Sequence, residues 1–284
     1  MPEAPEVHNA IKALEEQLLG KTIEKVVITH PKLAVNLPVE QFERELAGQR
    51  FEGFKRHGKF LVFILSTKIL VAHLRMEGRF LVLDDVQAYK ALDPLKDLKH
   101  IHAIFQLTND QIICYKDTRK FGRFYLYDKT ENWKSLPVFK KIGPDVMDPD
   151  LDVKWFMKKC RKKSLPIKSV LLDQSVIAGI GNIYADEILF ESGISPFTPA
   201  SHLDEADWQA ILDHTRTIMK KAAAAGGSTI RSFSYGNNHA GTYQDQLKVH
   251  GQDESPCPNC SGEIIRTKIG GRSTWYCPEC QKEK

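Results

Sequence analysis

The two ends of this chain carry the residue patterns best suited to chemistry. The chain begins Met1-Pro2-Glu3, so removal of Met1 would leave a secondary amine on Pro2 beside the carboxyl group of Glu3. An α-amino group has a reference pKa near ~8, against ~10.4 for a lysine side chain, so about a tenth of it is free base at neutral pH. A secondary amine that attacks an aldehyde-like sugar carbon forms an iminium, which makes the adjacent proton labile. The pair therefore predicts amine-catalysed elimination at a sugar.

The same end of the chain also has a purely structural interpretation. Pro5 and Glu6 are ordinary first-turn residues, the proline for its fixed φ and the glutamate for the helix dipole. Apolar residues then recur at helical spacing up to Gly20, which predicts a helix over residues 5–19. Both interpretations stay open from these residues alone.

Four of the six cysteines lie in the last 28 residues, as two Cys-x-x-Cys pairs separated by sixteen residues rich in β-formers. Four thiolates suit tetrahedral Zn²⁺ with no position open to substrate, so the pattern predicts one structural zinc ion. Its ligands would be Cys257, Cys260, Cys277 and Cys280. A redox pair or disulfides are the alternative. Cys114 and Cys160 stand apart and are expected in the core.

The elements that must position these groups follow from length and patterning. A chain of 284 residues is long enough for two domains, and 42% hydrophobic with 27% charged residues is typical of a globular protein. Short β-branched and aromatic runs broken by Gly, Asn and Asp predict an N-terminal β-sandwich. The expected strands cover residues 23–28, 59–65, 69–74, 80–83, 102–107, 112–115 and 123–127.

The composition changes at residues 142–150, where a glycine and two prolines among acidic residues indicate a linker. Beyond it, Gly179 and Gly181 predict a turn, with Asn182 as the cap of a following helix. An amphipathic helix is expected over residues 205–224, capped by Asp204 or Ser201. The fold class is therefore α+β: an N-terminal β-sandwich carrying a helix, then a helical domain ending in a β-hairpin zinc finger.

The charge distribution says more than the mildly basic net charge of +4. Seven basic residues fall between Lys154 and Lys168, interrupted by aromatic residues. Such a run is either a solvated face or a surface that follows phosphates. No apolar run has the length of a membrane span and no signal peptide is present, so a cytoplasmic location is expected.

Longer motifs resemble those of the formamidopyrimidine-DNA glycosylase and endonuclease VIII family. These are Met-Pro-Glu-x-Pro-Glu-Val at the start and Gly-Ile-Gly-Asn-Ile-Tyr-Ala-Asp-Glu at residues 179–187, and the resemblance covers essentially the full length. It implies that Pro2 is the covalent nucleophile, Glu3 the general acid and Glu6 a third active-site carboxylate. It also implies that Lys59, in Arg-His-Gly-Lys, contacts a phosphate in the catalytic region.

The resemblance implies further contacts with damaged double-stranded DNA. An enzyme that attacks a sugar inside a duplex must unstack the nucleotide, at a cost of a few kcal/mol. Met76, Arg119 and Phe121 would fill the gap that the everted nucleotide leaves. The remaining DNA contacts implied are His73, Lys168, Asn182, Arg231 and Arg272.

The implied domain order assigns a role to each part of the chain. Residues 1–135 would form the catalytic β-sandwich and residues 136–152 the linker. A helix-two-turn-helix domain over residues 153–230, a lesion-covering region over 231–250 and the zinc finger over 251–284 would follow. The lesion-covering interior, residues 233–239, departs from the common family pattern.

The expected function is that of a monomeric bacterial base-excision-repair enzyme, nucleoid-associated during repair. It would excise oxidised purines, namely 8-oxoguanine and formamidopyrimidines, from duplex DNA and cut the strand by β,δ-elimination through a Schiff base on Pro2. Endonuclease VIII, specific for oxidised pyrimidines, is the alternative within the family, and Met76, Arg119 and Phe121 favour the purine branch. A zinc-dependent DNA-binding module without chemistry is the alternative outside it, and the Pro2–Glu3 pair argues against that.

Overall fold

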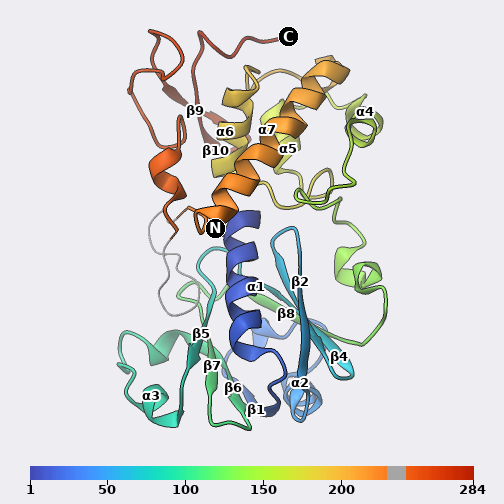
Figure 1. Cartoon of the computed structure of the whole chain (residues 1–284), viewed down its shortest axis with the longest axis vertical. Helices are drawn as coiled ribbons and strands as arrows, with labels where there is room; N and C mark the ends of the chain where they lie inside the picture. Colours follow the sequence, from blue (N-terminus) through green and yellow to red (C-terminus); the bar gives the residue numbers. More distant parts are fainter. Residues whose placement is uncertain (229–240) are drawn as a thin grey trace. The chain divides into compact units, whose positions relative to one another are not determined.

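The computed structural model describes residues 1–228 and 241–284, and their contacts divide the chain into two compact units. The first unit contains Met1–Lys140 and Gly226–Gly241, and the second contains Lys141–Ala225 and Thr242–Lys284 (Figure 1). The division near residue 140 falls inside the expected linker. The zinc-finger segment belongs to the same unit as the helices.

The first unit is built on two four-stranded antiparallel sheets, as expected for the β-sandwich. One sheet has the order β1-β6-β7-β5, with strands Ile23–Ile28, Ile101–Leu107, Ile112–Lys116 and Arg79–Leu83. The other has the order β2-β3-β4-β8, with strands Phe51–His57, Phe60–Leu65, Lys68–His73 and Arg123–Asp128.

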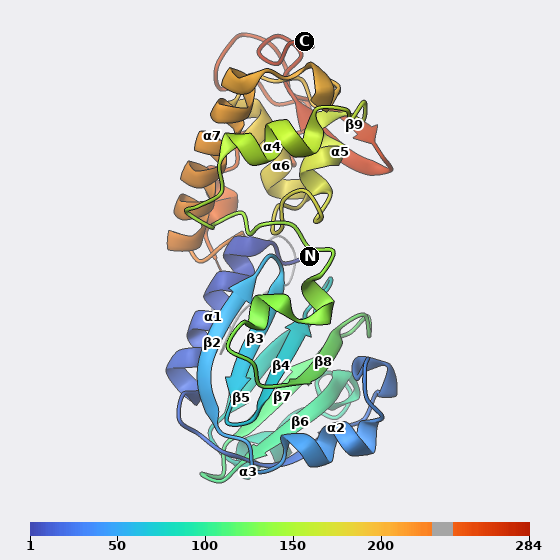
Figure 2. The same ribbon diagram turned by 90° about the vertical axis from the view of Figure 1, so that its right-hand side faces the viewer.

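Helix α1, Ala4–Leu18, carries the N-terminus of the chain and lies alongside β2 (Figure 2). Its buried face is formed by Val7, Ile11, Leu14 and Leu18, which join the core of the sandwich. Gly20 follows the helix with φ +79°, a left-handed conformation that glycine adopts without steric cost. The helix predicted over residues 5–19 is therefore displaced by one residue.

Strand β2 and helices α2, Val39–Leu46, and α3, Val86–Lys90, were not expected from the sequence. Strand β2 has charged residues and Gly53 in its interior, and its register against β3 shifts between Phe51 and Gly53. Its buried residues, Phe51, Phe54 and His57, recur at intervals of three, so the period of two that identifies a half-buried strand is absent. Short 3-10 helices at Pro31–Leu33, Leu98–His100, Trp133–Ser135 and Pro137–Phe139 complete the first unit.

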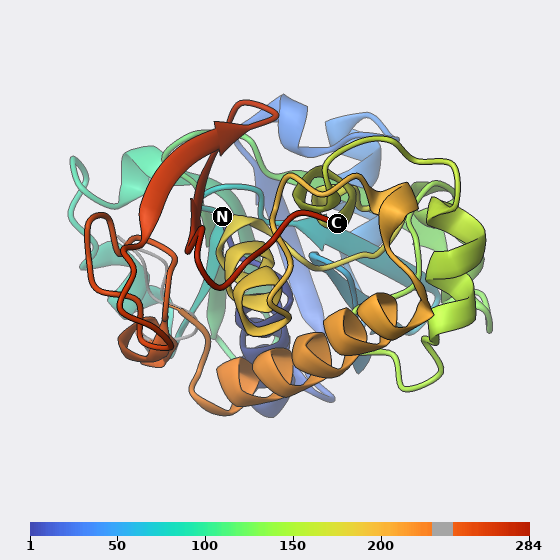
Figure 3. The same cartoon turned by 90° about the horizontal axis from the view of Figure 1, so that it is seen from above.

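The second unit contains helices α4, Val153–Cys160, α5, Ile167–Leu172, α6, Asn182–Glu191, and α7, Glu205–Ala224. Helix α6 lies between α7 and the hairpin formed by β9, Ile265–Ile269, and β10, Arg272–Tyr276 (Figure 3). Two 3-10 turns, Ala200–His202 and Tyr243–Gln246, connect these elements. Helix α7 begins in the expected capping box, in which Asp204 accepts from Asp207 N at 2.9 Å.

The expected cap of α6 was wrong, because Gly181 occupies that position and Asn182 is the first helical residue. The Asn182 side chain turns instead toward the β9–β10 hairpin. Cys114 and Cys160 are fully buried, which confirms them as core residues, and burial raises the pKa of their thiols to about 12 and about 11. Within the described ranges, no helix has both the length and the apolar character to cross a membrane.

Candidate active site and nucleic-acid interface

The first unit buries four ionisable side chains around its N-terminal region: Glu3, Glu6, Lys59 and His73. Glu6 makes the best-defined contacts. Its Oε2 accepts from the backbone N of Glu3 at 2.8 Å, which fixes the start of α1, and its Oε1 accepts from the backbone N of Ser228 at 2.7 Å. One carboxylate therefore joins the chain terminus to a residue 222 positions away.

The close approach to Glu6 requires glycine in the opposing segment. Gly227 has φ +84°, and a Cβ atom at this position would lie 2.7 Å from Glu6 Oε1. A Cβ atom on Gly241 would lie 2.0 Å from the carbonyl oxygen of Gly227. Gly227 and Gly241 are thus packed closely together, and Gly227 lies beside Glu6. Arg231, an expected DNA contact, lies outside the described residues.

The environment of the chain's terminal amine favours the free-base form of that amine. Burial lowers the pKa of the Met1 amine below its ordinary value of 8.0, and the charge of Lys59 lowers it further, while Glu3 and Glu6 act in the opposite direction. The net direction is downward. With Met1 in place the Pro2 nitrogen is an amide and has no basic lone pair, so removal of Met1 would place the basic amine one residue deeper.

Lys59 lies in the turn that connects β2 and β3, where Gly58 has φ +56°. Its side chain is buried, which differs from an ordinary lysine at a strand end. Its charge lowers the pKa of both the Met1 amine and His73, so the Lys59 ammonium lies within electrostatic range of both groups. The site residue expected here is therefore close to the terminal amine.

His73 is held as a neutral imidazole. Burial, followed by the charges of Arg75 and Lys59, lowers its pKa from 6.5 to about 3. Its Nδ1 accepts from the backbone N of Arg75 at 3.0 Å, so the single proton of the neutral ring is on Nε2. The ring also packs edge-on against Phe60, with 4.6 Å between centroids. His73 can therefore donate a hydrogen bond, but it carries no positive charge near neutral pH.

The three expected void-filling residues, Met76, Arg119 and Phe121, are exposed on two loops of the first unit. Met76 is 38% exposed and Phe121 is 44% exposed, which is unusual for such large apolar side chains. The guanidinium of Arg119 lies 4.8 Å from the centroid of the Phe121 ring, a cation–π contact.

The second unit brings Asn182 and the finger tip together, although they are 90 residues apart in sequence. Asn182 Nδ2 donates to the carbonyl oxygen of Ser273 at 2.9 Å, directly beside exposed Arg272. An amide nitrogen has two donors, so this contact occupies one of them. The tip itself turns through Gly270 and Gly271, with φ +56° and +75°, as a tight hairpin turn of type I′ requires.

Lys168 does not reach the surface: its side chain is 0% exposed. Its Nζ lies 2.6 Å from Asp186 Oδ1 and donates to the carbonyl oxygen of Ser273 at 2.8 Å and to Thr274 Oγ1 at 2.9 Å. An ammonium group has three donors. The ammonium therefore joins α5, α6 and β10. Direct binding of a phosphate by Lys168 stays a prediction.

Two residues of α6 with a well-defined role were missed from the sequence. Asp186 Oδ2 lies 2.8 Å from Nδ1 of His250, so this carboxylate contacts a lysine on one side and a histidine on the other. Glu187 accepts from the backbone N atoms of Lys248, Val249 and His250 at 2.8–2.9 Å. Burial raises the pKa of Glu187, although those three N–H donors oppose the shift. The acidic pair within the 179–187 motif was the signal that could have revealed them.

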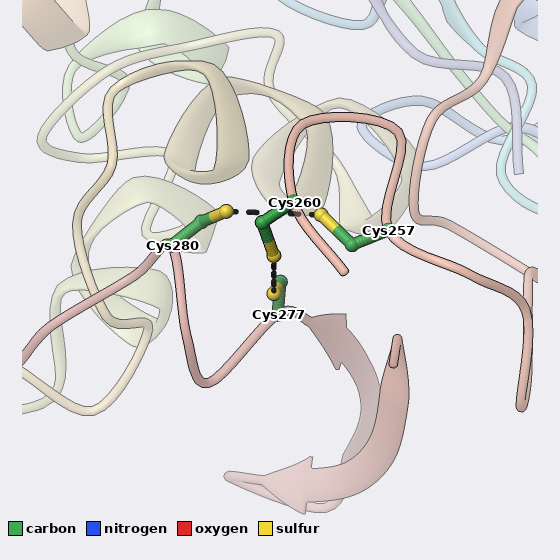
Figure 4. A group of neighbouring side chains, drawn as sticks. All are labelled: Cys257, Cys260, Cys277 and Cys280. Atoms are coloured by element: carbon green, nitrogen blue, oxygen red, sulfur yellow. Dashed lines mark hydrogen bonds between the residues drawn. The ribbon is translucent and has the colours of Figure 1, made fainter. Parts of the chain in front are cut away.

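The four cysteines of the finger converge as the spacing predicts (Figure 4). Their sulfur atoms lie within 4.8 Å of one another, with Cys257 to Cys280 at 3.7 Å and Cys260 to Cys277 at 3.6 Å. Tetrahedral bonds of ~2.3 Å to one zinc ion would separate the sulfurs by about 3.8 Å. The donor set and spacing therefore fit one structural zinc ion, and all six cysteines are free of disulfides.

Comparison with known proteins agrees with this architecture. Family models described as the formamidopyrimidine-DNA glycosylase N-terminal domain, the formamidopyrimidine-DNA glycosylase H2TH domain and the zinc finger found in FPG and IleRS match residues 1–124, 142–234 and 254–282. The chain is 39% identical over 282 residues to the formamidopyrimidine-DNA glycosylase of Listeria monocytogenes, covering 99% of this chain and 100% of the relative. It is 40% identical over 283 residues to that of Bacillus anthracis, covering 99% of each.

Solved structures of Lactococcus lactis proteins are similar over the same length. An FPG mutant in complex with Fapy-dG-containing DNA has a TM-score of 0.89 and 35% identity, and Fpg with abasic-site DNA has a TM-score of 0.88 and 35% identity. Each comparison covers 99% of this chain and 100% of the other. The domain order and the cysteine site define a DNA-repair glycosylase with a structural zinc finger. The chain belongs to the formamidopyrimidine-DNA glycosylase family, whose members combine glycosylase and abasic-site lyase activities.

Proposed function

We propose that this protein excises oxidised purines from duplex DNA and cleaves the strand by β,δ-elimination through a Schiff base on Pro2. The observation that carries the proposal is the burial of two carboxylates at the start of the chain, where Glu6 Oε2 accepts from the backbone N of Glu3 at 2.8 Å. The lowered pKa of the terminal amine supports it. The Lactococcus lactis neighbours bound to Fapy-dG-containing and abasic-site DNA support the substrate class.

In the proposed reaction, the free amine of Pro2 attacks C1′ of the damaged nucleotide and the N-glycosidic bond breaks. The base leaves with the bonding electron pair and takes up the proton that the amine nitrogen releases. Glu3 protonates O4′ as the sugar ring opens, and the amine becomes an iminium. Water then takes a proton from C2′, which expels the 3′ phosphate, and afterwards a proton from C4′, which expels the 5′ phosphate. Water finally hydrolyses the iminium and restores the amine. A general acid in such a step contributes about 10²–10⁴-fold.

The remaining residues receive roles that fit their chemistry. Lys59 offers a cation that lowers the pKa of the amine and neutralises a nearby phosphate. His73 offers a neutral Nε2–H donor to a phosphate oxygen. Asn182, through its second amide donor, and Arg272 form a phosphate contact at the finger tip. Lys168 holds Ser273 and Thr274 of the hairpin through its ammonium group and thereby positions that contact without touching DNA.

Borohydride trapping on an abasic-site duplex, followed by mass mapping of the adduct, tests the proposal. The adduct is expected on Pro2 in protein whose intact mass shows that Met1 is absent, and Pro2→Gly is expected to reduce trapping strongly. Lys55→Met, at an exposed position of β2, is the matched control and should trap as well as the parent protein. An adduct on Lys59, or no adduct at all, would refute the mechanism, and the second result would favour a lesion-binding protein without chemistry.

The substrate branch is tested separately. Excision is expected to be faster from duplexes with 8-oxoguanine than from duplexes with an oxidised pyrimidine, because the void-filling residues are those of the purine branch. Faster excision of the pyrimidine would assign the chain to the endonuclease VIII branch and leave the Pro2 chemistry intact.

A further inference from the structure

Two separate loops of the first unit carry the void-filling residues. Residues 74–78 connect β4 to β5 and carry Met76, while residues 117–122 connect β7 to β8 and carry Arg119 and Phe121. Exposed loops are normally more mobile than the strands they connect. The contacts beneath these two loops indicate a different behaviour.

The second loop is folded around one buried carboxylate. Asp117 is 1% exposed, and its Oδ1 accepts from the backbone N of Arg119 at 3.0 Å. Its Oδ2 accepts from the backbone N of Phe121 and of Gly122, both at 2.9 Å, and from the Tyr115 hydroxyl at 3.3 Å. The two void-filling residues of this loop therefore have their backbone positions set by a single side chain.

The Tyr115 hydroxyl also touches the first loop. A Cβ atom on Gly78 would lie 2.1 Å from this oxygen, and a Cβ atom on Gly122 would lie 1.8 Å from it, so only glycine fits at both places. The first loop is closed by Gly78 N, which donates to Leu74 O at 3.1 Å. Burial and the neighbouring Asp117 raise the pKa of Tyr115 far above its usual range, so the hydroxyl keeps its proton and donates.

Aromatic packing holds the Tyr115 ring in place, and a second contact joins the two loops at the protein surface. The Tyr115 ring packs against Phe124 at 4.8 Å and Phe80 at 5.3 Å between centroids, which fixes its direction. At the surface, Thr118 Oγ1 of the second loop donates to Glu77 Oε2 of the first. The two loops are thus joined both at their base and at their surface.

We propose that Tyr115 and Asp117 are positioning residues that hold the two loops as one rigid piece, so that Met76, Arg119 and Phe121 enter the duplex together. This inference rests on the proposed role of these three side chains in filling the space of the everted nucleotide. Loops that are already ordered lose less conformational freedom when the three side chains enter the duplex, which lowers the cost of eversion.

Two conservative variants test the pair. Tyr115→Phe removes only the hydroxyl between the loops, and Asp117→Asn places an N–H donor against at least one of the backbone donors of the second loop. Each is expected to reduce excision of 8-oxoguanine from duplex DNA by about tenfold to a hundredfold. Each is also expected to slow the fluorescence rise of a 2-aminopurine base placed opposite the lesion.

Trapping on a single-stranded abasic oligonucleotide separates positioning from chemistry, because this substrate needs no unstacking. Both variants are expected to trap as well as the parent protein, to within about twofold. Asp97→Asn is the matched control, since Asp97 also pairs with a β7 residue, Lys116 at 2.6 Å, but the described contacts of its side chain include no donor of either loop. Equal losses on single-stranded and duplex substrates would overturn the proposal.

Hydrogen exchange in the free protein tests the coupling without any reaction. If the loops form one piece, Asp117→Asn should accelerate exchange at Gly78 in the first loop as well as at Phe121 and Gly122 in the second. Acceleration confined to the second loop would overturn the proposal whether or not the protein cleaves DNA. Failure of the parent protein to trap would instead refute the proposed function, and this exchange result would still decide the coupling.

Discussion

Each unit of the molecule buries a cluster of ionisable residues, and the two clusters differ in what surrounds them. In the first unit, Glu3, Glu6 and Lys59 act on the pKa of a terminal amine. In the second unit, Lys168 and Asp186 form an ion pair of 2.6 Å with both side chains fully buried. The first cluster shifts the pKa of another group, the terminal amine. In the second cluster, the charges of Lys168 and Asp186 pair with each other.

This comparison shows that a buried charge does not by itself indicate a catalytic site. A buried ion pair with hydrogen bonds on all sides serves mainly to fix geometry, and its desolvation cost offsets much of its attraction. A buried charge beside a titratable nucleophile is instead a functional-site candidate. On this basis we propose that the first cluster takes part in catalysis and that the second positions the finger tip.

The largest expected effect concerns the zinc site of the second unit, whose four cysteines fit a structural ion. Zinc contributes roughly 10–16 kcal/mol to the folding of small zinc-finger peptides, so chelation should abolish exchange protection in β9 and β10. DNA affinity should fall by about ten- to a hundredfold as the tip contacts are lost. The exchange rates of β3 serve as the control and should not change. Undiminished DNA binding in demetallated protein would contradict the assignment.

The next effect concerns the first cluster. Glu3→Gln keeps the shape of the side chain and removes its proton, so single-turnover excision of 8-oxoguanine should fall by about 10²–10⁴-fold. Binding to the same duplex should change little, because the residue acts mainly in the transition state. Glu24→Gln, on an exposed position of β1, is the control and should excise normally. A Glu3→Gln protein with normal single-turnover rates would remove Glu3 from the mechanism.

Breaking the buried pair of the second unit should affect stability before it affects chemistry. Lys168→Met leaves Asp186 without its lysine and should lower the free energy of unfolding by about 3–5 kcal/mol, as measured by urea denaturation. Lys163→Met is the matched control: its pair with Asp173 is 3.5 Å long and partly exposed, so it should cost less than about 1 kcal/mol. Similar losses in both variants would show that the buried pair has no special role.

His73 gives the first cluster a pH signature. Its pKa is about 3 in the folded chain against an ordinary 6.5, so the unfolded chain binds the proton first as the pH falls. The stabilisation is therefore complete above pH 6.5 and is lost between pH 6.5 and about 3, by at most about 1.4 kcal/mol per pH unit. His73→Gln should flatten this dependence in urea unfolding at pH 4–7. His30 and His102, whose pKa values burial also lowers, should leave a smaller residual slope. An unchanged slope in the variant would contradict the neutral His73.

The smallest effect distinguishes a surface contact from an internal one. Arg272→Ala should weaken DNA binding and reduce the slope of log affinity against log salt by about 0.9, the value of one phosphate contact. Lys220→Ala removes an exposed charge from α7 and should leave the slope unchanged. Measuring the Lys168→Met protein alongside completes the comparison, because a buried ammonium should also leave the slope unchanged. A reduced slope in that variant would restore Lys168 as a phosphate ligand.

Features that depend on local spacing could be predicted from the sequence, because neighbouring residues alone determine them. The four zinc cysteines, helix α7 and its Asp204 cap, and most strands are of this kind. Strand β2 escaped prediction because its buried residues recur at intervals of three and not of two. The position of Lys168 could not be predicted either, since the partners that bury it, Ser273 and Thr274, are more than a hundred residues away. A basic residue in a DNA-binding motif gives no local sign of whether it faces solvent.

The two oxygens of Glu6 have a consequence for the evolution of this enzyme. One oxygen holds the backbone at Glu3 and the other holds it at Ser228, where the 229–240 segment begins. Insertions and substitutions within positions 229–240 therefore need not disturb the two hydrogen bonds by which Glu6 holds Glu3 and Ser228. Sequence variation there is compatible with an unchanged arrangement of hydrogen bonds at the start of α1.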